Sequence, residues 1–356
     1  MNIAIFETRR EKLRALIHKA GLEALVVTLD ANRFYLSSFE LHDPQINESA
    51  GCLIIGRHGR DWLCTDPRYQ DAARRLWDED RIFIYKGKAM VKINSLLKDH
   101  YSGPVGFEAA NLSVEAFDQL REGVDLRRAG GMVEALRLVK DAGEIAAMER
   151  SCALNHSLMA WLPGVLAPGR SEAQIAWDIE QFFRNHGAEE LAFPSIVAIN
   201  GNAALPHAEP GEDRLDDNCA LLVDVGCRLD RYCSDQTRSF WVGDKPDSLF
   251  SADLNHIQEA QRRAISLIRP GADCAAIYAA AKNYLDEQGV GDLFTHGLGH
   301  GVGLQTHEGP SLGRESPGVL QAGMVLTVEP GLYRPGRFGV RWEYMVLVTE
   351  DGHRVL

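Results

Sequence analysis

The segment LLVDVGCRLDRYCSDQTRS, residues 221–239, decides how we interpret the fold. It opens as an apolar strand that contains Asp224, and Asp235 follows after a polar stretch. The two acids are symmetric about Leu229 and Asp230, which predicts a hairpin that places them opposite each other, with Cβ atoms about 5 Å apart. Two carboxylates that close repel each other unless a cation lies between them, so the hairpin predicts a metal site.

A salt-bridged turn is the alternative, in which neighbouring arginines neutralise the two acids: Arg228, Arg231 and Arg238. A second pair of acids favours the metal. Glu329 ends the apolar strand Val325–Val328, and Glu343 enters another apolar strand. These two acids are symmetric about Gly336, so a second hairpin again predicts opposed carboxylates.

Histidines gather between the two acid pairs, in HGLGHGVGLQTHEGP at residues 296–310. Three histidines and five glycines in fifteen residues are hard to explain by packing, and a surface glycine loop is the weaker interpretation. The histidines are His296, His300 and His307. A fourth, His207, ends the loop segment NGNAALPH that follows a predicted strand. We expect this group to supply nitrogen ligands or proton carriers.

Four carboxylates and one nitrogen suit one or two divalent ions of the Mn, Co or Zn type. Two ions about 3.5–4 Å apart share a hydroxide and bind both oxygens of a tetrahedral intermediate. The residues alone therefore predict hydrolysis of an amide bond.

The remainder of the chain divides into two parts of different character. The first alternates short apolar runs with helical patterns: a capping box at Thr8-x-x-Glu11 opens a helix, and Phe34–Leu36 is one expected strand. This alternation predicts an α/β domain with a mixed sheet. Later helices and strands come in blocks. We expect an α+β protein with an N-terminal α/β domain over 1–127 and a second domain over 128–356.

Composition argues against several classes of protein. The 356 residues are 45% apolar and 25% charged, and 38 basic against 50 acidic residues give a formal net charge of −12. The acidic surplus argues against a nucleic-acid partner. No apolar run approaches the ~20 residues that cross a bilayer, so no membrane contact is expected. The seven cysteines form no C-x-x-C pair and no signal peptide is visible, so we expect reduced, mostly buried thiols in a cytoplasmic protein.

Five segments, taken in order, resemble the pita-bread metallopeptidases, the superfamily of methionine aminopeptidase, aminopeptidase P, prolidase and creatinase. They are FPSIVAINGNAALPH (193–207), DVG with SDQTRS (224–239), HGLGHGVGLQTHEGP (296–310), MVLTVEPGLY (324–333) and GVRWEYMVLVTEDG (339–352). The stretch 134–148 resembles the entry to the catalytic domain of the proline-specific branch. The resemblance implies a creatinase/prolidase-type α/β domain followed by a pita-bread domain. It also implies a homodimer that hydrolyses Xaa-Pro bonds as a dipeptidase or aminopeptidase.

The same resemblance implies a set of metal ligands. They are Asp224, Asp235, His300, Glu329 and Glu343. In the family, these positions hold two divalent ions (Mn, Co or Zn), the second Asp and the last Glu bridge both ions, and the ions share a hydroxide.

Three further roles are implied by the matching positions. Glu329 matches the residue that carries a proton from the bridging water to the leaving amine. His207 and His307 match the substrate-binding pair that polarises the carbonyl and stabilises the gem-diolate. Arg341 matches an arginine that supports the bridging acids without binding metal.

Some positions depart from the family pattern. Tyr344 stands where the family often has Asp, so a supporting charge is missing. Arg314 and Arg334 are candidates to bind the free carboxylate of a dipeptide, which leaves dipeptidase and aminopeptidase both open. The same fold would also suit a creatinase-like enzyme acting on small C–N substrates, or a non-catalytic binding scaffold. The intact ligand set argues against both of these functions.

Overall fold

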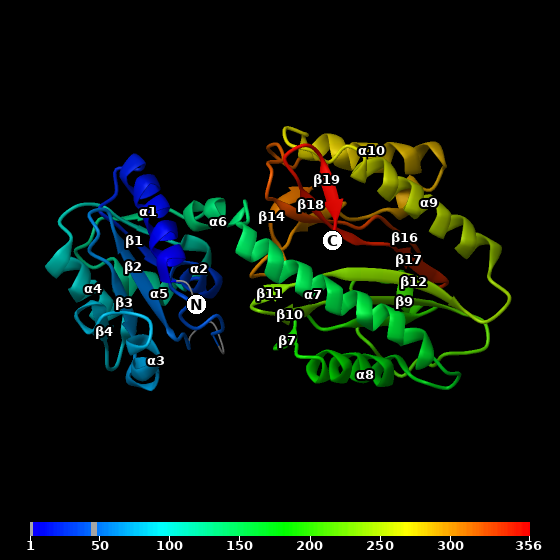
Figure 1. The fold of residues 1–356 in the computed structure, drawn as a ribbon, viewed down its shortest axis with the longest axis horizontal. Coiled ribbons are helices and arrows are strands. Elements are labelled where there is room, and N and C mark those ends of the chain that lie inside the picture. The colour runs from blue at the N-terminus through cyan, green and yellow to red at the C-terminus, as the bar shows by residue number, and fades with distance from the viewer. Residues whose placement is uncertain (1–2, 44–47) are drawn as a thin grey trace. The chain divides into compact units, whose positions relative to one another are not determined.

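The computed structural model describes residues 3–43 and 48–356, and the chain forms two compact units, Met1–Arg137 and Leu138–Leu356. Figure 1 shows the elements of each unit. The division lies ten residues after the boundary expected at 127. The difference arises because β6 (Leu126–Arg128) pairs in parallel with β5 (Val105–Phe107) and so completes the sheet of the first unit, and because the helix that follows, residues 132–137, contacts α1 and α2.

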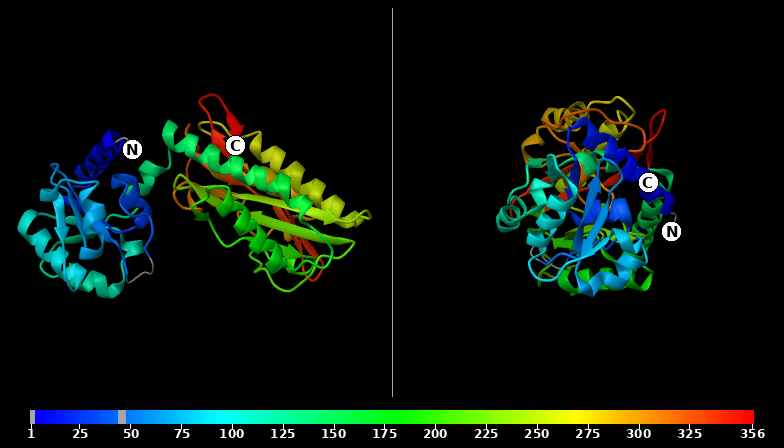
Figure 2. Two further views of the ribbon diagram at one scale, coloured as in Figure 1. Left: turned by 60° about the horizontal axis from the view of Figure 1, so that its bottom comes forward. Right: turned by 90° about the vertical axis from the view of Figure 1, so that its left-hand side faces the viewer.

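The first unit is built on a six-stranded mixed sheet in the order β4-β3-β2-β1-β5-β6. Strand β2 runs antiparallel to β1 and β3, whereas the other neighbours pair in parallel. Helices α1 and α2 lie on one side of this sheet and α4 and α5 on the other (Figure 2, right). Its other elements are α1 (Ile3–Lys19), β1 (Ala24–Val27), α2 (Asp30–Ser37), β2 (Gly51–Gly56), β3 (Trp62–Thr65), α3 (Gln70–Arg74), β4 (Ile82–Ile84), α4 (Ala89–His100), α5 (Val114–Leu120) and α6 (Met132–Arg137).

Two local predictions for this unit are wrong. Helix α1 is already formed before Thr8, whose hydroxyl donates to the carbonyl of Ala4 (3.0 Å) from within the helix, so Thr8 caps nothing. The run Phe34–Leu36 is helical, within α2. A short apolar run that is buried all round fits a helix as well as a strand, and only the flanking residues separate the two.

The second unit holds several antiparallel sheets. Strands β12-β9-β8 form one, β11-β10-β7 a second, β14-β13-β15-β18-β19 a third, and β16-β17 a hairpin. The strands are β7 (Glu190–Leu191), β8 (Ile196–Ile199), β9 (Cys219–Val225), β10 (Cys227–Leu229), β11 (Tyr232–Cys233), β12 (Gln236–Val242), β13 (Gly299–Gly301), β14 (Glu308–Leu312), β15 (Val325–Val328), β16 (Gly331–Arg334), β17 (Phe338–Arg341), β18 (Tyr344–Val348) and β19 (His353–Val355). The helices are α7 (Ala142–Trp161), α8 (Glu172–Asn185), α9 (Ser248–Ile265) and α10 (Cys274–Glu287).

Two pairs of helices pack against these sheets. Helices α9 and α10 run side by side and pack on β15 and β18, while α7 and α8 pack on β8 and β9 (Figures 1 and 2). Along β9, Leu221 and Val223 point to the α7–α8 core. Leu222 points the other way, toward Ala208, and Asp224 shares its face by the two-residue period of a strand.

Two expectations from composition can be checked here. All seven cysteines are free and buried. No helix in the described part of the chain is long and apolar enough to span a bilayer.

Candidate active site

The first acid pair comes from one ladder, although its two members are not cross-strand partners. Asp224 on β9 opposes Thr237 on β12. The predicted turn is wrong by one position, because the hairpin turns at Asp230 and Arg231, whose φ angles are 50° and 74°. The ladder is therefore shifted by two residues. Since strand side chains alternate with a period of two, this shift keeps Asp235 on the face that carries Asp224.

The second hairpin has the predicted register. Val328 pairs with Tyr344 in the β15–β18 ladder, and the β16–β17 ladder continues the same alignment. Gly336 lies in the turn with a φ of 71°, a conformation that glycine adopts without strain. In this register Glu329 is aligned with Glu343, and both lie between the β15–β18 ladder and the β16–β17 ladder.

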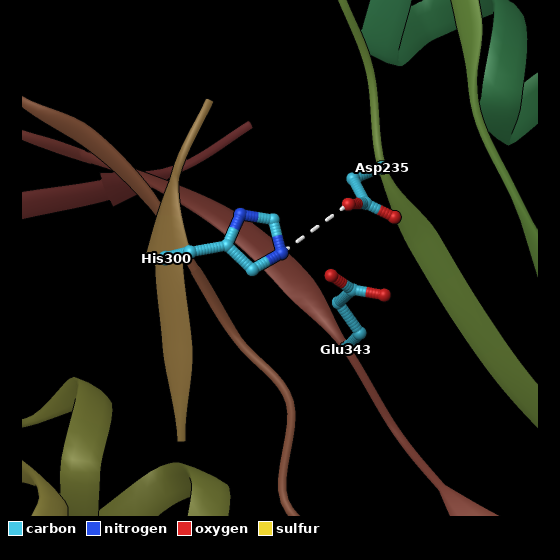
Figure 3. Close-up of side chains that lie close together, drawn as sticks. All are labelled: Asp235, His300 and Glu343. Atoms are coloured by element: carbon cyan, nitrogen blue, oxygen red, sulfur yellow. Dashed lines mark ion pairs between the residues drawn. The ribbon is translucent and has the colours of Figure 1, made fainter. Parts of the chain in front are cut away.

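His300 on β13 brings the two acid pairs together. Its Nε2 atom lies 3.3 Å from Glu329 Oε1 and 3.6 Å from Asp235 Oδ2. Asp235, His300 and Glu343 each offer a ligand atom within 4.8 Å of the other two, and their side chains point toward one another from three different segments (Figure 3). These groups are spaced closely enough to share one cation.

Electrostatics at the site indicate that a cation fits. Asp224 Oδ1 and Glu343 Oε1 are buried and have no hydrogen-bond partner among the described residues. Burial, reinforced by the neighbouring carboxylates, raises the pKa of both Asp235 and Glu343 well above the ordinary value. Two unsatisfied oxygens in an acidic, buried cluster match the oxygen-rich, single-nitrogen donor set that divalent metals accept.

Glu329 and His300 behave differently from the other ligand candidates. Burial acts to raise the pKa of Glu329, but the hydrogen bond and charge of His300 lower it to about 2. Burial likewise acts to lower the pKa of His300, yet Glu329 outweighs it and the pKa is raised. The two shifts favour an imidazolium of His300 beside an ionised Glu329 in the metal-free arrangement.

Arg341 forms hydrogen bonds that hold two of the acids, Asp224 directly and Glu343 through Thr237. Its Nη2 donates to Asp224 Oδ2 (2.6 Å), and its Nε donates to the Thr237 hydroxyl (3.1 Å). Thr237 in turn donates to Glu343 Oε2 (2.7 Å). Arg341 is 3% exposed, so its charge acts on Asp224 with less screening by solvent than at the protein surface. It contacts Asp224 directly and reaches Glu343 through one hydroxyl.

A pocket of about 400 Å³ opens at these residues. All the predicted metal ligands except Glu343 line it, together with the predicted substrate-binding histidines and Arg341: His207, Asp224, Asp235, His300, His307, Glu329 and Arg341. The rings of His300 and His307 are 4.2 Å apart at their centroids. Burial and the neighbouring His300 lower the pKa of His307, which favours the neutral imidazole. The wall of the pocket also includes apolar residues: Phe193, Pro194, Ile196, Pro206 and Ala208.

His296 was predicted only as a member of the histidine group and was given no role of its own. His296 lies in the pocket wall, and its Nε2 is 2.9 Å from the Tyr333 hydroxyl, which accepts a hydrogen bond from Arg341 (2.8 Å). Burial lowers the pKa of His296. The available signal was its place in the glycine-rich segment, four residues before His300.

Tyr344 has a neighbour that explains how the chain accommodates it. The Arg238 guanidinium lies over the rings of Trp342 and Tyr344, at 4.5 and 4.3 Å from their centroids. Arg238 also donates to the backbone carbonyls of Thr237 (2.8 Å) and Glu343 (2.5 Å). An aromatic face therefore contacts this arginine, and the arginine holds the backbone of Glu343.

The other arginines considered from the sequence are engaged elsewhere. Arg228 forms an ion pair with Glu190 (2.8 Å). Arg334 donates to both carboxylate oxygens of Asp253, at 2.5 and 2.8 Å, so it binds a side chain of α9. Arg314 is exposed and is not part of the pocket wall. The suggestion that Arg314 or Arg334 binds a substrate carboxylate is therefore not supported by the geometry of the described residues.

Comparison with known proteins agrees with this geometry. Residues 146–350 match the model of metallopeptidase family M24, and residues 9–139 match the creatinase/prolidase N-terminal domain. An uncharacterized peptidase of Bacillus subtilis, YqhT, is 29% identical over 97% of this chain and 96% of its own length.

Solved structures show the same two-part architecture. A Xaa-Pro dipeptidase from Bacillus anthracis superimposes with a TM-score of 0.91 at 31% identity, covering 98% of this chain and 97% of the other. An X-Pro aminopeptidase from Thermotoga maritima gives 0.83 at 27% identity, covering 94% and 95%. The expected fold, an α/β domain followed by a pita-bread domain, is confirmed.

Proposed function

The chain belongs to metallopeptidase family M24, and from that membership we propose that it hydrolyses Xaa-Pro peptide bonds. The observation that carries the proposal is the convergence of Asp224, Asp235, Glu329 and His300 on one pocket that also presents His207 and His307. Glu343 lies beside Asp235 and His300. The names of its solved relatives, a Xaa-Pro dipeptidase and an X-Pro aminopeptidase, agree with it.

The residues that would hold metal are Asp224, Asp235, His300, Glu329 and Glu343. Their support is the short spacing of Asp235, His300 and Glu343, the contact of His300 with Glu329, and the two buried oxygens of Asp224 and Glu343 that lack partners among the described residues. We propose two divalent ions, with manganese or cobalt as the first ones to test. When bound, a divalent cation acts as a Lewis acid toward the scissile carbonyl and lowers the pKa of water.

The chain's own side chains then perform the proton transfer and hold the carbonyl. Glu329 takes up the proton of the attacking water at a carboxylate oxygen and delivers it to the nitrogen of the leaving proline. His207 and His307 donate hydrogen bonds to the oxygen that becomes negative. A neutral His307 still has one N–H to donate, which is consistent with its lowered pKa.

The apolar part of the wall supports a preference for proline. Phe193, Pro194, Ile196 and Pro206 offer surface to the pyrrolidine ring, whose amide nitrogen carries no N–H and needs no hydrogen-bond acceptor. A residue with a free amide N–H would leave that donor facing apolar groups, which costs binding free energy.

Metal analysis followed by a peptide panel tests the proposal. We expect purified protein to contain a divalent metal, to lose activity on chelation, and to regain it with manganese or cobalt. Xaa-Pro dipeptides and tripeptides are compared with the same peptides carrying alanine in place of proline. Asp235→Asn is expected to abolish hydrolysis, while Asp244→Asn, at an exposed position, serves as the matched control. Full activity of Asp235→Asn, or of metal-free protein, would contradict the proposal.

We also propose that the protein works as a homodimer in the cytoplasm. The resemblance to the family supports the dimer, and the burial of all seven thiols is consistent with a reducing compartment. Sedimentation of the purified protein tests the first statement, and fractionation of the source cells tests the second.

A further inference from the structure

A carboxylate that catalysis does not use lies buried at the start of α8. Glu172 is the first residue of this helix and is 0% exposed. Its position suits a negative charge, because the N-terminal end of a helix carries the positive end of the helix dipole. Burial raises the pKa of Glu172, although its hydrogen bonds act to lower it. Keeping this carboxylate ionised inside the protein therefore costs free energy.

Its contacts join the two ends of one loop. Oε1 accepts a hydrogen bond from the backbone N–H of Ile199 (2.6 Å). Oε2 accepts from the Asn202 side chain and from the backbone N–H of Gly211, both at 2.8 Å. A single carboxylate thus closes the segment 199–211 at both of its ends. A carboxylate is an acceptor at every lone pair, which matches three N–H donors.

The loop that Glu172 closes carries one wall of the pocket. Pro206, His207, Ala208 and Glu209 all line the pocket, and all lie inside the segment 199–211. His207 itself is an exposed residue, so the backbone of the segment sets its place more than side-chain packing does. The segment reaches the rest of the site where Arg341 donates to the Pro206 carbonyl (3.0 Å).

We propose that Glu172 is a positioning residue: its carboxylate holds the two ends of segment 199–211 together and thereby sets the place of His207 at the pocket. The inference rests on the proposed function, because it takes His207 to bind the substrate carbonyl. Glu172 would thus support the active site from the opposite side of the loop, without contacting substrate or metal.

Glu172→Gln tests it with little change of shape. The amide nitrogen of glutamine is a donor, so it faces a donor at the Asn202 side chain and at Gly211 N–H, and the loop closure is lost on one side. We expect kcat for Xaa-Pro substrates to fall by roughly 10–100-fold, with a smaller change in KM. Glu212→Gln makes the same chemical change at an exposed position of the adjacent chain and is the control.

A double-mutant cycle with His207→Ala separates positioning from a general loss of stability. If Glu172 acts through His207, Glu172→Gln has little further effect on kcat once His207 is gone. An equal fold-loss in both backgrounds overturns the proposal, as does an unchanged kcat in the folded single variant. The exchange Glu172→Gln with Asn202→Asp restores a donor opposite an acceptor at position 202 but leaves the Gly211 N–H facing a donor, so it is expected to recover only part of the lost kcat.

Hydrogen exchange gives a readout that does not depend on activity. Amides of residues 200–211 are expected to exchange faster in Glu172→Gln than in Glu212→Gln and wild type. If Glu172→Gln does not fold, Asn202→Ala removes one of the three contacts and takes its place in both measurements. Unchanged exchange overturns the proposal. A wild-type protein without Xaa-Pro activity refutes the proposed function instead, so the two failures are distinguishable.

Discussion

Replacing Glu343 with glutamine is expected to stabilise the metal-free protein while removing its ability to bind metal tightly. Glu343 is 1% exposed, and its Oε1 atom has no hydrogen-bond partner among the described residues. Its other oxygen accepts from the Thr237 hydroxyl (2.7 Å), a bond that a glutamine carbonyl keeps. The substitution thus removes a buried charge and retains the shape.

The magnitude follows from the unsatisfied oxygen. A buried polar atom without a partner costs about 1–3 kcal/mol, and more when it is charged. The catalytic unit Leu138–Leu356 has roughly 220 residues, and for a domain of that size 1 kcal/mol shifts Tm by about 2–4 °C. We therefore expect metal-free Glu343→Gln to melt about 2–12 °C above metal-free wild type near neutral pH.

The effect has a definite pH dependence. Burial and the neighbouring acids raise the pKa of Glu343 in the folded protein above its ordinary value of 4.5. The protonated Glu343 side chain contributes its full stability to the folded protein below pH 4.5. This contribution is lost as the pH rises through the pKa of the folded state. The advantage of Glu343→Gln should therefore be absent at low pH and grow as the pH increases.

Thermal melting in a chelator, over a series of pH values, measures this directly. Glu350→Gln, at an exposed position of the same chain segment, is the control and should not shift Tm. Adding manganese should raise the Tm of wild type more than that of the variant, since only tight binding stabilises the folded state. A metal-free variant that melts at or below wild type near neutral pH, or an advantage that does not vary with pH, would refute the reasoning.

Other side chains give equally direct tests. Tyr344→Phe keeps the ring against Arg238 and should leave metal affinity unchanged, whereas Tyr344→Ala should weaken it by roughly 10–100-fold in a calorimetric titration; equal affinities would contradict this. Arg334→Met leaves the Asp253 carboxylate buried and unpaired, so we expect a loss of about 3–5 kcal/mol in denaturant unfolding. A rise in KM confined to Xaa-Pro dipeptides would instead make Arg334 a substrate contact. The native protein should resist a thiol reagent and react at all seven cysteines once unfolded; rapid native labelling would count against their burial.

The two acid hairpins show what local sequence determines. The turn of the second contains Gly336, a residue suited to positive φ, and symmetry about it gave the observed register. The first hairpin turns at Asp230 and Arg231, and neither residue is a glycine. The sequence therefore gave no reason to prefer this turn over the predicted one at Leu229 and Asp230. The error shifted the register by two residues, which preserved the face of each side chain. The candidate acids were therefore found although one pairing was wrong.

Contacts between distant segments lay beyond prediction from one sequence. Nothing near Glu172 indicates that its carboxylate meets Ile199, Asn202 and Gly211, because these partners are brought to it by the packing of α8 on β8. From sequence, Tyr344 indicated only that a supporting carboxylate was missing. The structure shows that its ring contacts the Arg238 guanidinium. In both cases the local signal was a residue type, and its meaning came from tertiary packing.

The distribution of ligand candidates along the chain has a consequence for how the protein matures. Asp224 and Asp235 belong to the half of the catalytic unit built around β8, β9 and β12, whereas His300, Glu329 and Glu343 belong to the half built on β13 to β18. A nascent chain that ends before β13 holds two acids and no complete site. The two halves bring like charges to their meeting place, so binding of the proposed metal would join them. On that proposal, metal uptake requires that the second half has docked onto the first.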